Sequence, residues 1–171
     1  SILDIPAVHV NVRPWVYFLA KRELYTSSFG CRFLSWWGAI PIDRDHVAIQ
    51  SVKDILGMLK RGKIISIFPE GHRIPSGKTW HDFPPKMGVV KFAKRSKASI
   101  LPMAVKGSYT PFHRVTVTVG DMFELEDLVN VDGSAMDEAE MAVEMMRRVY
   151  ALNGEEYAVT ADEVRYAEQK R

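Results

Sequence analysis

The sequence predicts an α/β fold, a single domain in which helices flank a mixed, largely parallel central sheet. Residues 64–68 form a short, continuous apolar run of the kind found in strands that are covered on both faces, as in parallel sheets. Directly before them, apolar side chains in residues 48–59 recur at the spacing of one helix face. Strands that alternate with amphipathic helices favour the α/β class, and 171 residues are enough for one compact core.

The first half of the chain contains two predicted strands and two predicted helices. An apolar, β-prone run at residues 16–20 ends at charged residues, as a strand that delivers polar side chains to a sheet edge would. Residues 29–38 have helix-like spacing but are aromatic on all sides. The helix at residues 48–59 is expected to end at the Lys-Arg-Gly of residues 60–62, and the strand at 64–68 follows at once.

The second half continues the alternation of helices and strands. A helix is predicted at residues 88–97, an apolar strand at 100–105, and an alternating strand with one solvated face at 115–119. The last helix has Ser134 as its expected cap and Gly154 just beyond its end. Its apolar face is predicted from the spacing of Ala139, Ala142, Val143, Met146, Val149 and Tyr150. These elements complete the predicted α/β domain.

The ends of the chain and its single cysteine bear on domain organisation. We expect one domain over residues 1–154, followed by a charged tail or a short helix over residues 155–171. Residues 1–6 have the composition of the interior of an element, so we expect a piece of a longer protein. Cys31 is the only cysteine, which excludes an intrachain disulfide and favours a reducing compartment. No apolar run approaches the roughly 20 residues of a membrane-spanning helix.

Charge is distributed unevenly along the chain. Residues 61–97 hold nine Lys or Arg against two Asp or Glu, whereas residues 121–171 hold five against fourteen. The basic stretch is a candidate anion-binding surface, although a solvated helix face would have the same charge. No nucleic-acid-binding module is recognisable, and the acidic second stretch would repel phosphate backbones, so we do not expect a nucleic-acid partner.

Residues that suit an anionic ligand follow the strand at 64–68. The sequence Phe68-Pro69-Glu70-Gly71-His72-Arg73 places an acid, a glycine, a histidine and an arginine where ligands bind in α/β proteins, at the end of a buried strand. Gly71 lets backbone amides approach a ligand closely, and the Arg73 guanidinium matches phosphate or carboxylate. The alternative is a plain loop in which Glu70 and Arg73 only pair with each other.

Residues 68–73 resemble the most distinctive block of the lysophosphatidate acyltransferase family, Phe-Pro-Glu-Gly-Thr-Arg-Ser, and depart from it at His72. Upstream, Gly38 and Arg44 match the family's Gly-x-x-Phe-x-x-Arg block, with Pro41 in place of the aromatic residue. Two looser agreements are the Lys-Arg-Glu-Leu that begins at Lys21 and the apolar, proline-containing strand at 98–103. The resemblance covers residues 1–107 and implies a glycerol-3-phosphate acyltransferase-like fold.

The family's catalytic block, His-x-x-x-x-Asp, is matched only in its second half. Ser1-Ile2-Leu3-Asp4 is similar to the end of the block, so the histidine is expected two positions before Ser1. None of the five histidines present has an aspartate five positions later; these are His9, His46, His72, His81 and His113. We therefore expect residues 1–154 to be an N-terminally truncated catalytic domain that is inactive until the upstream histidine is restored.

The resemblance implies an activity in phospholipid biosynthesis. A fatty acyl group would move from acyl-CoA or acyl carrier protein to the free hydroxyl of a lysophospholipid, with 1-acylglycerol 3-phosphate as the first choice of acceptor. The histidine would take the proton of that hydroxyl, and Asp4 would fix its tautomer, as in a triad without serine. Glu70 and Gly71 would form the wall beside the reacting hydroxyl.

Substrate binding is assigned by the same resemblance. Arg44 and Arg73, helped by Lys21, would hold the phosphate of the lysophospholipid. His72 stands at the family's threonine position and would either shape this phosphate pocket or hydrogen-bond the loop. The reaction implies no cofactor and no metal, since the acyl thioester is itself a substrate.

Membrane contact is implied by the substrate and by four aromatic residues. Phe29, Phe33, Trp36 and Trp37, with the basic stretch at 61–97, are candidate anchors on an anionic surface, and would place the protein at the cytoplasmic face of a membrane. The alternative is that the four rings fill the core of the domain.

Two other functions fit the same residues. A binding module could hold a phosphorylated lipid through Arg44 and Arg73 without turning it over. A hydrolase could use water in place of the lipid hydroxyl as the nucleophile on the same thioester.

Overall fold

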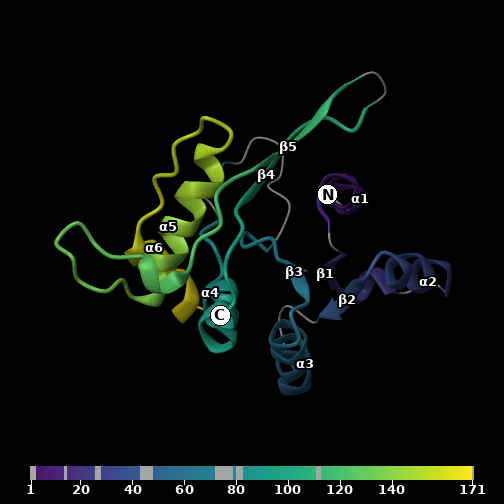
Figure 1. Cartoon of the computed structure of the whole chain (residues 1–171), viewed down its shortest axis with the longest axis horizontal. Helices are drawn as coiled ribbons and strands as arrows, with labels where there is room; N and C mark the ends of the chain where they lie inside the picture. The colour runs from purple at the N-terminus through teal and green to yellow at the C-terminus, as the bar shows by residue number, and fades with distance from the viewer. Residues whose placement is uncertain are drawn as a thin grey trace. The chain divides into compact units, whose positions relative to one another are not determined.

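The computed structural model describes residues 3–13, 15–25, 28–42, 48–71, 79, 83–110 and 113–170. The chain divides into two compact units, Ser1–Ile67 and Phe68–Arg171, which are treated separately below (Figure 1). Within them, helices and strands alternate along most of the chain, and a parallel sheet is flanked by helices. The predicted α/β class is confirmed.

The sheet of the first unit has three parallel strands in the order β2-β1-β3. The central strand β1 (Val16–Lys21) lies between β2 (Ala39–Ile42) and β3 (Ile64–Ser66), so that Phe18 is opposite both Ala39 and Ser66. Phe18 is only 1% exposed, as expected for the middle of a parallel sheet that is covered on both faces. Val16 and Ala20 of the same strand are buried as well.

The strand β2 differs from the sequence-based expectation, which placed no strand at residues 39–42. This segment has four residues and contains Pro41, which cannot donate to a strand ladder and therefore argues against a strand. Because β2 is an edge strand, the missing amide is tolerated on its outer side, and Pro41 lies opposite Ala20 in the register. The turn at Gly38 has φ +71 and leads directly into the strand.

Helices connect the parallel strands of the first unit. The 3-10 turn η1 (Arg22–Tyr25) and α2 (Ser28–Trp36) join β1 to β2, and α3 (Ile49–Lys60) joins β2 to β3. Parallel neighbours require such crossovers. The predicted end of α3 is confirmed, because Gly62 adopts φ +72 just after the last helical turn. At the start of the unit, α1 (Asp4–Asn11) buries the face that carries Asp4, Ile5 and Val8.

The aromatic residues of the 29–38 segment divide between core and surface. Trp36 is 71% and Phe33 is 44% exposed, whereas Trp37 is partly buried and meets His9 edge-on at 5.4 Å between ring centroids. The side chain of Phe29 lies outside the described part of the structure. Among the helices that can be described, none combines the length and the apolar character needed to cross a bilayer.

The second unit is built from helices packed beside a pair of strands. Its strands β4 (Met103–Gly107) and β5 (Val115–Val119) are antiparallel and form a sheet of their own, where the sequence suggested one mixed sheet. In Figure 1 this pair extends away from the helices of the unit. The other elements in the described part of this unit are α4 (Gly88–Ser96), η3 (Leu125–Asp127), α5 (Glu138–Ala151) and α6 (Ala161–Gln169).

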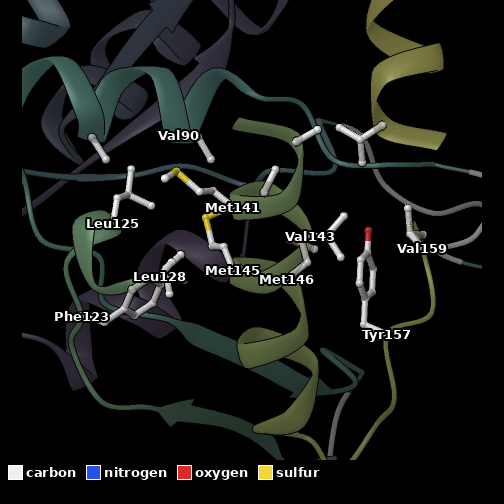
Figure 2. Close-up of a cluster of buried hydrophobic side chains, with 14 residues drawn as sticks. Val90, Phe123, Leu125, Leu128, Met141, Val143, Met145, Met146, Tyr157 and Val159 are labelled. Atoms are coloured by element: carbon white, nitrogen blue, oxygen red, sulfur yellow. The ribbon is translucent and has the colours of Figure 1, made fainter. Parts of the chain in front are cut away.

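The core of the second unit forms around α5 (Figure 2). Ala142 is fully buried and Met146 is 1% exposed, and they pack with Val90 of α4 and with Leu125 and Leu128 of the η3 segment. Burying a methionine, valine or leucine side chain contributes about 1.5–3 kcal/mol. The apolar face from which this helix was predicted is therefore also the face whose burial stabilises the helix most.

The start of α5 corrects one expectation. Asp137, and not Ser134, is the N-cap, because its carboxylate accepts from the backbone amides of Ala139 and Glu140 while the Glu140 side chain accepts from the amide of Asp137. Ser134 instead donates both its amide and its hydroxyl to Asp132 in the preceding turn. A complete capping box is worth more than a lone serine cap, so the helix begins three residues later.

Residues 155–171 contain α6, the helical alternative of the two that the sequence left open. Tyr157, Val159 and Val164 are each at most 3% exposed and belong to the core around α5. Arg165 ties α6 to the N-cap of α5, because its Nε donates to Asp137 Oδ2 at 3.2 Å. These contacts fix the segment onto α5, and where the catalytic domain ends remains a prediction.

Candidate functional site

The motif blocks follow the carboxyl ends of the parallel strands. Lys21 is the last residue of β1, and Arg44 comes two residues after the end of β2. Glu70 comes four residues after Ser66, the end of β3. Because the three strands are parallel, their carboxyl ends lie at one edge of the sheet, which is where α/β proteins bind ligands.

Asp4 lies in the first turn of α1 and is 9% exposed. A carboxylate at this position is stabilised by the positive end of the helix dipole. The burial of an acidic side chain is costly unless it is compensated, and an acid kept at such a place is a candidate for chemistry. Asp4 belongs to the first unit, as does Lys21, whose side chain lies outside the described atoms.

The turn after β3 holds Glu70 and Gly71 in the second unit. The Gly71 amide donates to the carbonyl of Phe68 at 3.1 Å, and the Lys86 amide donates to the carbonyl of Pro69 at 2.8 Å. Gly71 has φ +78, a conformation that favours glycine. A methyl group at Gly71 would stand 2.8 Å from Cε of Lys86, so the Lys86 side chain lies directly against the glycine.

Lys86 is a residue that sequence reasoning did not single out. It belongs to the basic stretch at 61–97, but nothing in the spacing separates it from the other eight cations there. The structure brings it to the turn from a position fifteen residues along the chain from Gly71. An ammonium group beside a turn that carries a carboxylate can pair with that acid or with an anionic ligand.

Glu70 is partly buried and accepts a hydrogen bond from Tyr150. The Tyr150 Oη lies 3.0 Å from Glu70 Oε1, although eighty residues separate the two in sequence. Burial raises the pKa of Glu70 above its ordinary value of 4.5, and the hydrogen bond from Tyr150 opposes that rise. Burial and then the negative charge of Glu70 raise the pKa of Tyr150, so the phenol remains a neutral donor.

Tyr150 is itself held in place by its neighbours. It is the penultimate residue of α5, and its ring packs on that of Tyr157 at 4.9 Å between centroids. Tyr157 is 3% exposed and lies in the core (Figure 2). The sequence assigned Tyr150 only to the apolar face of the helix, and no local signal marks its hydroxyl as a partner of Glu70.

Three of the predicted substrate-binding residues, Arg44, His72 and Arg73, lie outside the described residues, and their roles stay predictions. Of the others, the structure places Glu70 and Gly71 in one turn with Lys86 and Tyr150 against it. Within the described ranges, no group of three or more His, Cys, Asp or Glu side chains is arranged to hold a metal ion. The arrangement offers a carboxylate that can accept from a hydroxyl, in a turn against which the side chain of Lys86 lies.

Comparisons with known proteins agree with the motif blocks. A model of the protein family described as Acyltransferase matches residues 1–106. A 1-acyl-sn-glycerol-3-phosphate acyltransferase from Bacillus subtilis is 34% identical over 106 residues, which cover 61% of this chain and 51% of that protein. A protein of the same name from Streptococcus pneumoniae is 28% identical over 130 residues, covering 70% and 45%. The chain spans about half the length of the curated relatives that it matches.

A solved structure shares the fold. The crystal structure of the 1-acyl-sn-glycerophosphate (LPA) acyltransferase PlsC from Thermotoga maritima superposes with a TM-score of 0.64 and 19% sequence identity. The match covers 90% of this chain and 62% of that one. At this identity the likeness supports the fold alone.

The contact between Gly71 and Lys86 predicts different outcomes for two glycine substitutions. Gly71→Ala and Gly154→Ala both place a side chain at positive φ, +78 and +70, and each should lower the free energy of unfolding by about 1–2 kcal/mol. A methyl group at Gly154 meets nothing within 4 Å, whereas one at Gly71 displaces Lys86. With ¹³C-dimethylated lysines, the NMR signal of Lys86, assigned with Lys86→Arg, should move only in Gly71→Ala. A signal that stays in place in Gly71→Ala would contradict the described turn.

Proposed function

Because the chain belongs to the acyltransferase family, we propose that the full-length protein is an acyltransferase of phospholipid biosynthesis. It moves a fatty acyl group from acyl-CoA or acyl carrier protein to the free hydroxyl of a lysophospholipid. The acceptor is 1-acylglycerol 3-phosphate and the product is phosphatidate, a choice that the names of the relatives support.

The observation that carries this proposal is the turn Phe68-Pro69-Glu70-Gly71 at the end of a parallel strand. Its glutamate is a partly buried carboxylate that a helix of the same unit holds through Tyr150. A buried carboxylate raises the free energy of the folded state unless its charge is compensated. A carboxylate at such a position is therefore a candidate functional residue. Beside an acceptor hydroxyl, the carboxylate orients that hydroxyl by accepting its hydrogen bond.

The reaction needs a base for the acceptor hydroxyl and a group that orients the base. The expected histidine upstream of Ser1 takes the proton, and Asp4 accepts from the other ring nitrogen and so fixes the tautomer. The hydroxyl oxygen attacks the thioester carbonyl, the C–S bond breaks, and the imidazolium returns its proton to the leaving thiolate. The burial of Asp4 in the first turn of α1 supports this role, because an orienting acid must be held still.

Cations hold the phosphate of the acceptor. Arg44 and Arg73 supply planar guanidinium groups that bind phosphate through two hydrogen bonds each, and Lys21 adds a point charge at the end of β1. Within the second unit, Lys86 is a further candidate cation, because its side chain lies against Gly71 in the same turn as Glu70. Together they select a phosphorylated acceptor over a neutral glyceride.

The arginine of the motif gives the first test of the proposed function. In the full-length protein, Arg73→Ala should raise the apparent KM for 1-acylglycerol 3-phosphate about tenfold or more, because a charged bidentate contact in a partly dry site is strong. Arg114→Ala, which removes an exposed guanidinium just before β5 and outside the basic stretch, should leave it unchanged. Labelled acyl-CoA separates acyl transfer from hydrolysis by the product formed. An unchanged KM in Arg73→Ala would refute the assignment, and free fatty acid as the main product would favour a hydrolase.

Membrane contact follows from an acceptor that resides in a lipid layer. The exposed rings of Trp36 and Phe33 on α2 supply apolar area for a membrane surface. The basic stretch at 61–97 supplies the charge that anionic lipids attract. We propose that the protein docks by these residues on the cytoplasmic face of a membrane.

Vesicle binding tests the docking residue directly. Trp36→Ala should weaken partitioning of the protein onto phosphatidylglycerol-containing vesicles by about fivefold to tenfold, since a large exposed ring is lost. Tyr166→Ala is the matched control, because it removes another exposed ring, 59% exposed, from α6. Equal partitioning of the two variants in a sedimentation assay would contradict docking through α2.

A further inference from the structure

The hydrogen bond between Tyr150 and Glu70 joins a helix to the motif turn. Tyr150 Oη donates to Glu70 Oε1 at 3.0 Å. The family model matches residues 1–106, so Tyr150 lies outside the matched range. None of the motif blocks includes it either. The partner of the motif glutamate thus comes from a segment to which no role had been assigned.

The helix that carries Tyr150 is anchored at its start and along its length. At its start the capping box of Asp137 and Glu140 satisfies the backbone amides of the first turn. Along its length, Ala142 and Met146 are at most 1% exposed. A donor placed on a packed helix is held more accurately than one on a loop.

The ring of Tyr150 has little freedom to turn away from Glu70. It packs on the ring of Tyr157 with centroids 4.9 Å apart and a tilt of 40°, and Tyr157 is itself buried. The hydroxyl therefore meets one carboxylate oxygen of Glu70 in a fixed direction. A hydrogen bond from a neutral donor to a carboxylate is of the stronger, charge-assisted kind.

The electrostatic surroundings explain why Glu70 needs such a donor. Burial raises the pKa of Glu70, which favours the protonated acid, and the Tyr150 hydrogen bond acts in the opposite direction. Among the described residues, Tyr157 and Glu155 both act on Tyr150, and Lys86 lies nearby, because its Nζ would stand 3.6 Å from a methyl group at Gly71. Tyr150 donates a hydrogen bond to this glutamate from the last turn of α5.

We propose that Tyr150 is a positioning residue for the reaction, whose hydrogen bond fixes the orientation of the Glu70 carboxylate toward the acceptor hydroxyl. This inference rests on the proposed function, in which Glu70 contacts the acceptor. Tyr150 itself touches no substrate. With Tyr150 included, the candidate site extends beyond the family motif to α5.

The test uses Tyr150→Phe in the full-length protein. This substitution keeps the ring on Tyr157 and removes only the hydroxyl, so folding should persist, which thermal unfolding checks. At pH 6, kcat/KM for acyl transfer should fall about tenfold. The acidic limb of the pH profile should move to higher pH, because Glu70 then loses the bond that favours its ionised form. A loss of packing alone would lower activity at every pH without moving the limb.

Two further measurements make the result decisive. Tyr166→Phe removes a hydroxyl from an exposed tyrosine on α6 and should leave the limb in place. The Glu70 carboxyl can be titrated by ¹³C NMR, with its signal assigned by Glu70→Gln, and should titrate at higher pH in Tyr150→Phe than in the wild type.

The outcomes distinguish the inference from the function on which it rests. An active wild type with unchanged limb and titration in Tyr150→Phe would overturn the role of Tyr150. A wild type that transfers no acyl group would overturn the proposed function, and the titration of Glu70 would then decide by itself whether Tyr150 controls its ionisation.

Discussion

A partly buried carboxylate is the constraint around which the candidate site is arranged. Glu70 follows a parallel strand within a turn that Gly71 and Lys86 shape, and the Tyr150 hydroxyl at 3.0 Å compensates part of its burial. The hydrogen bond between Tyr150 and Glu70 requires the last turn of α5 to stay beside the motif turn. The position of one side chain therefore depends on a helix eighty residues away.

Other elements of the second unit hold α5 in place. The capping box at Asp137 starts α5, and its apolar face forms the core with α4 and the η3 segment. Arg165 of α6 bonds to Asp137 as well, and the segment before α6 supplies Tyr157, on which the Tyr150 ring packs. Residues beyond the family motifs thus help to hold the motif residue Glu70 in position.

The sequence predicted what depends on local spacing and missed what depends on contacts between distant residues. The helices and the strand β1 could be predicted because apolar side chains that are buried on one face of an element recur at a regular spacing in the sequence. The strand β2 was missed because Pro41 argues against a strand, and only its edge position makes it acceptable. Ser134 was the expected N-cap of the last helix, whereas Asp137 and Glu140 form the capping box of α5. Tyr150 could be placed on a helix face, but its contact with Glu70 depends on tertiary packing.

The most direct test of this account is the free energy of unfolding of Glu70→Gln compared with the wild type as a function of pH. Glutamine keeps an acceptor for Tyr150 and has no charge to desolvate. Because burial raises the pKa of Glu70 above 4.5 in the folded state, the wild type loses stability as pH rises through that pKa. Glu70→Gln should therefore be the more stable protein at pH 8, with a difference that shrinks toward pH 4.5. A variant that is less stable than the wild type at pH 8 would contradict the claim that this carboxylate is retained for function at a cost in stability.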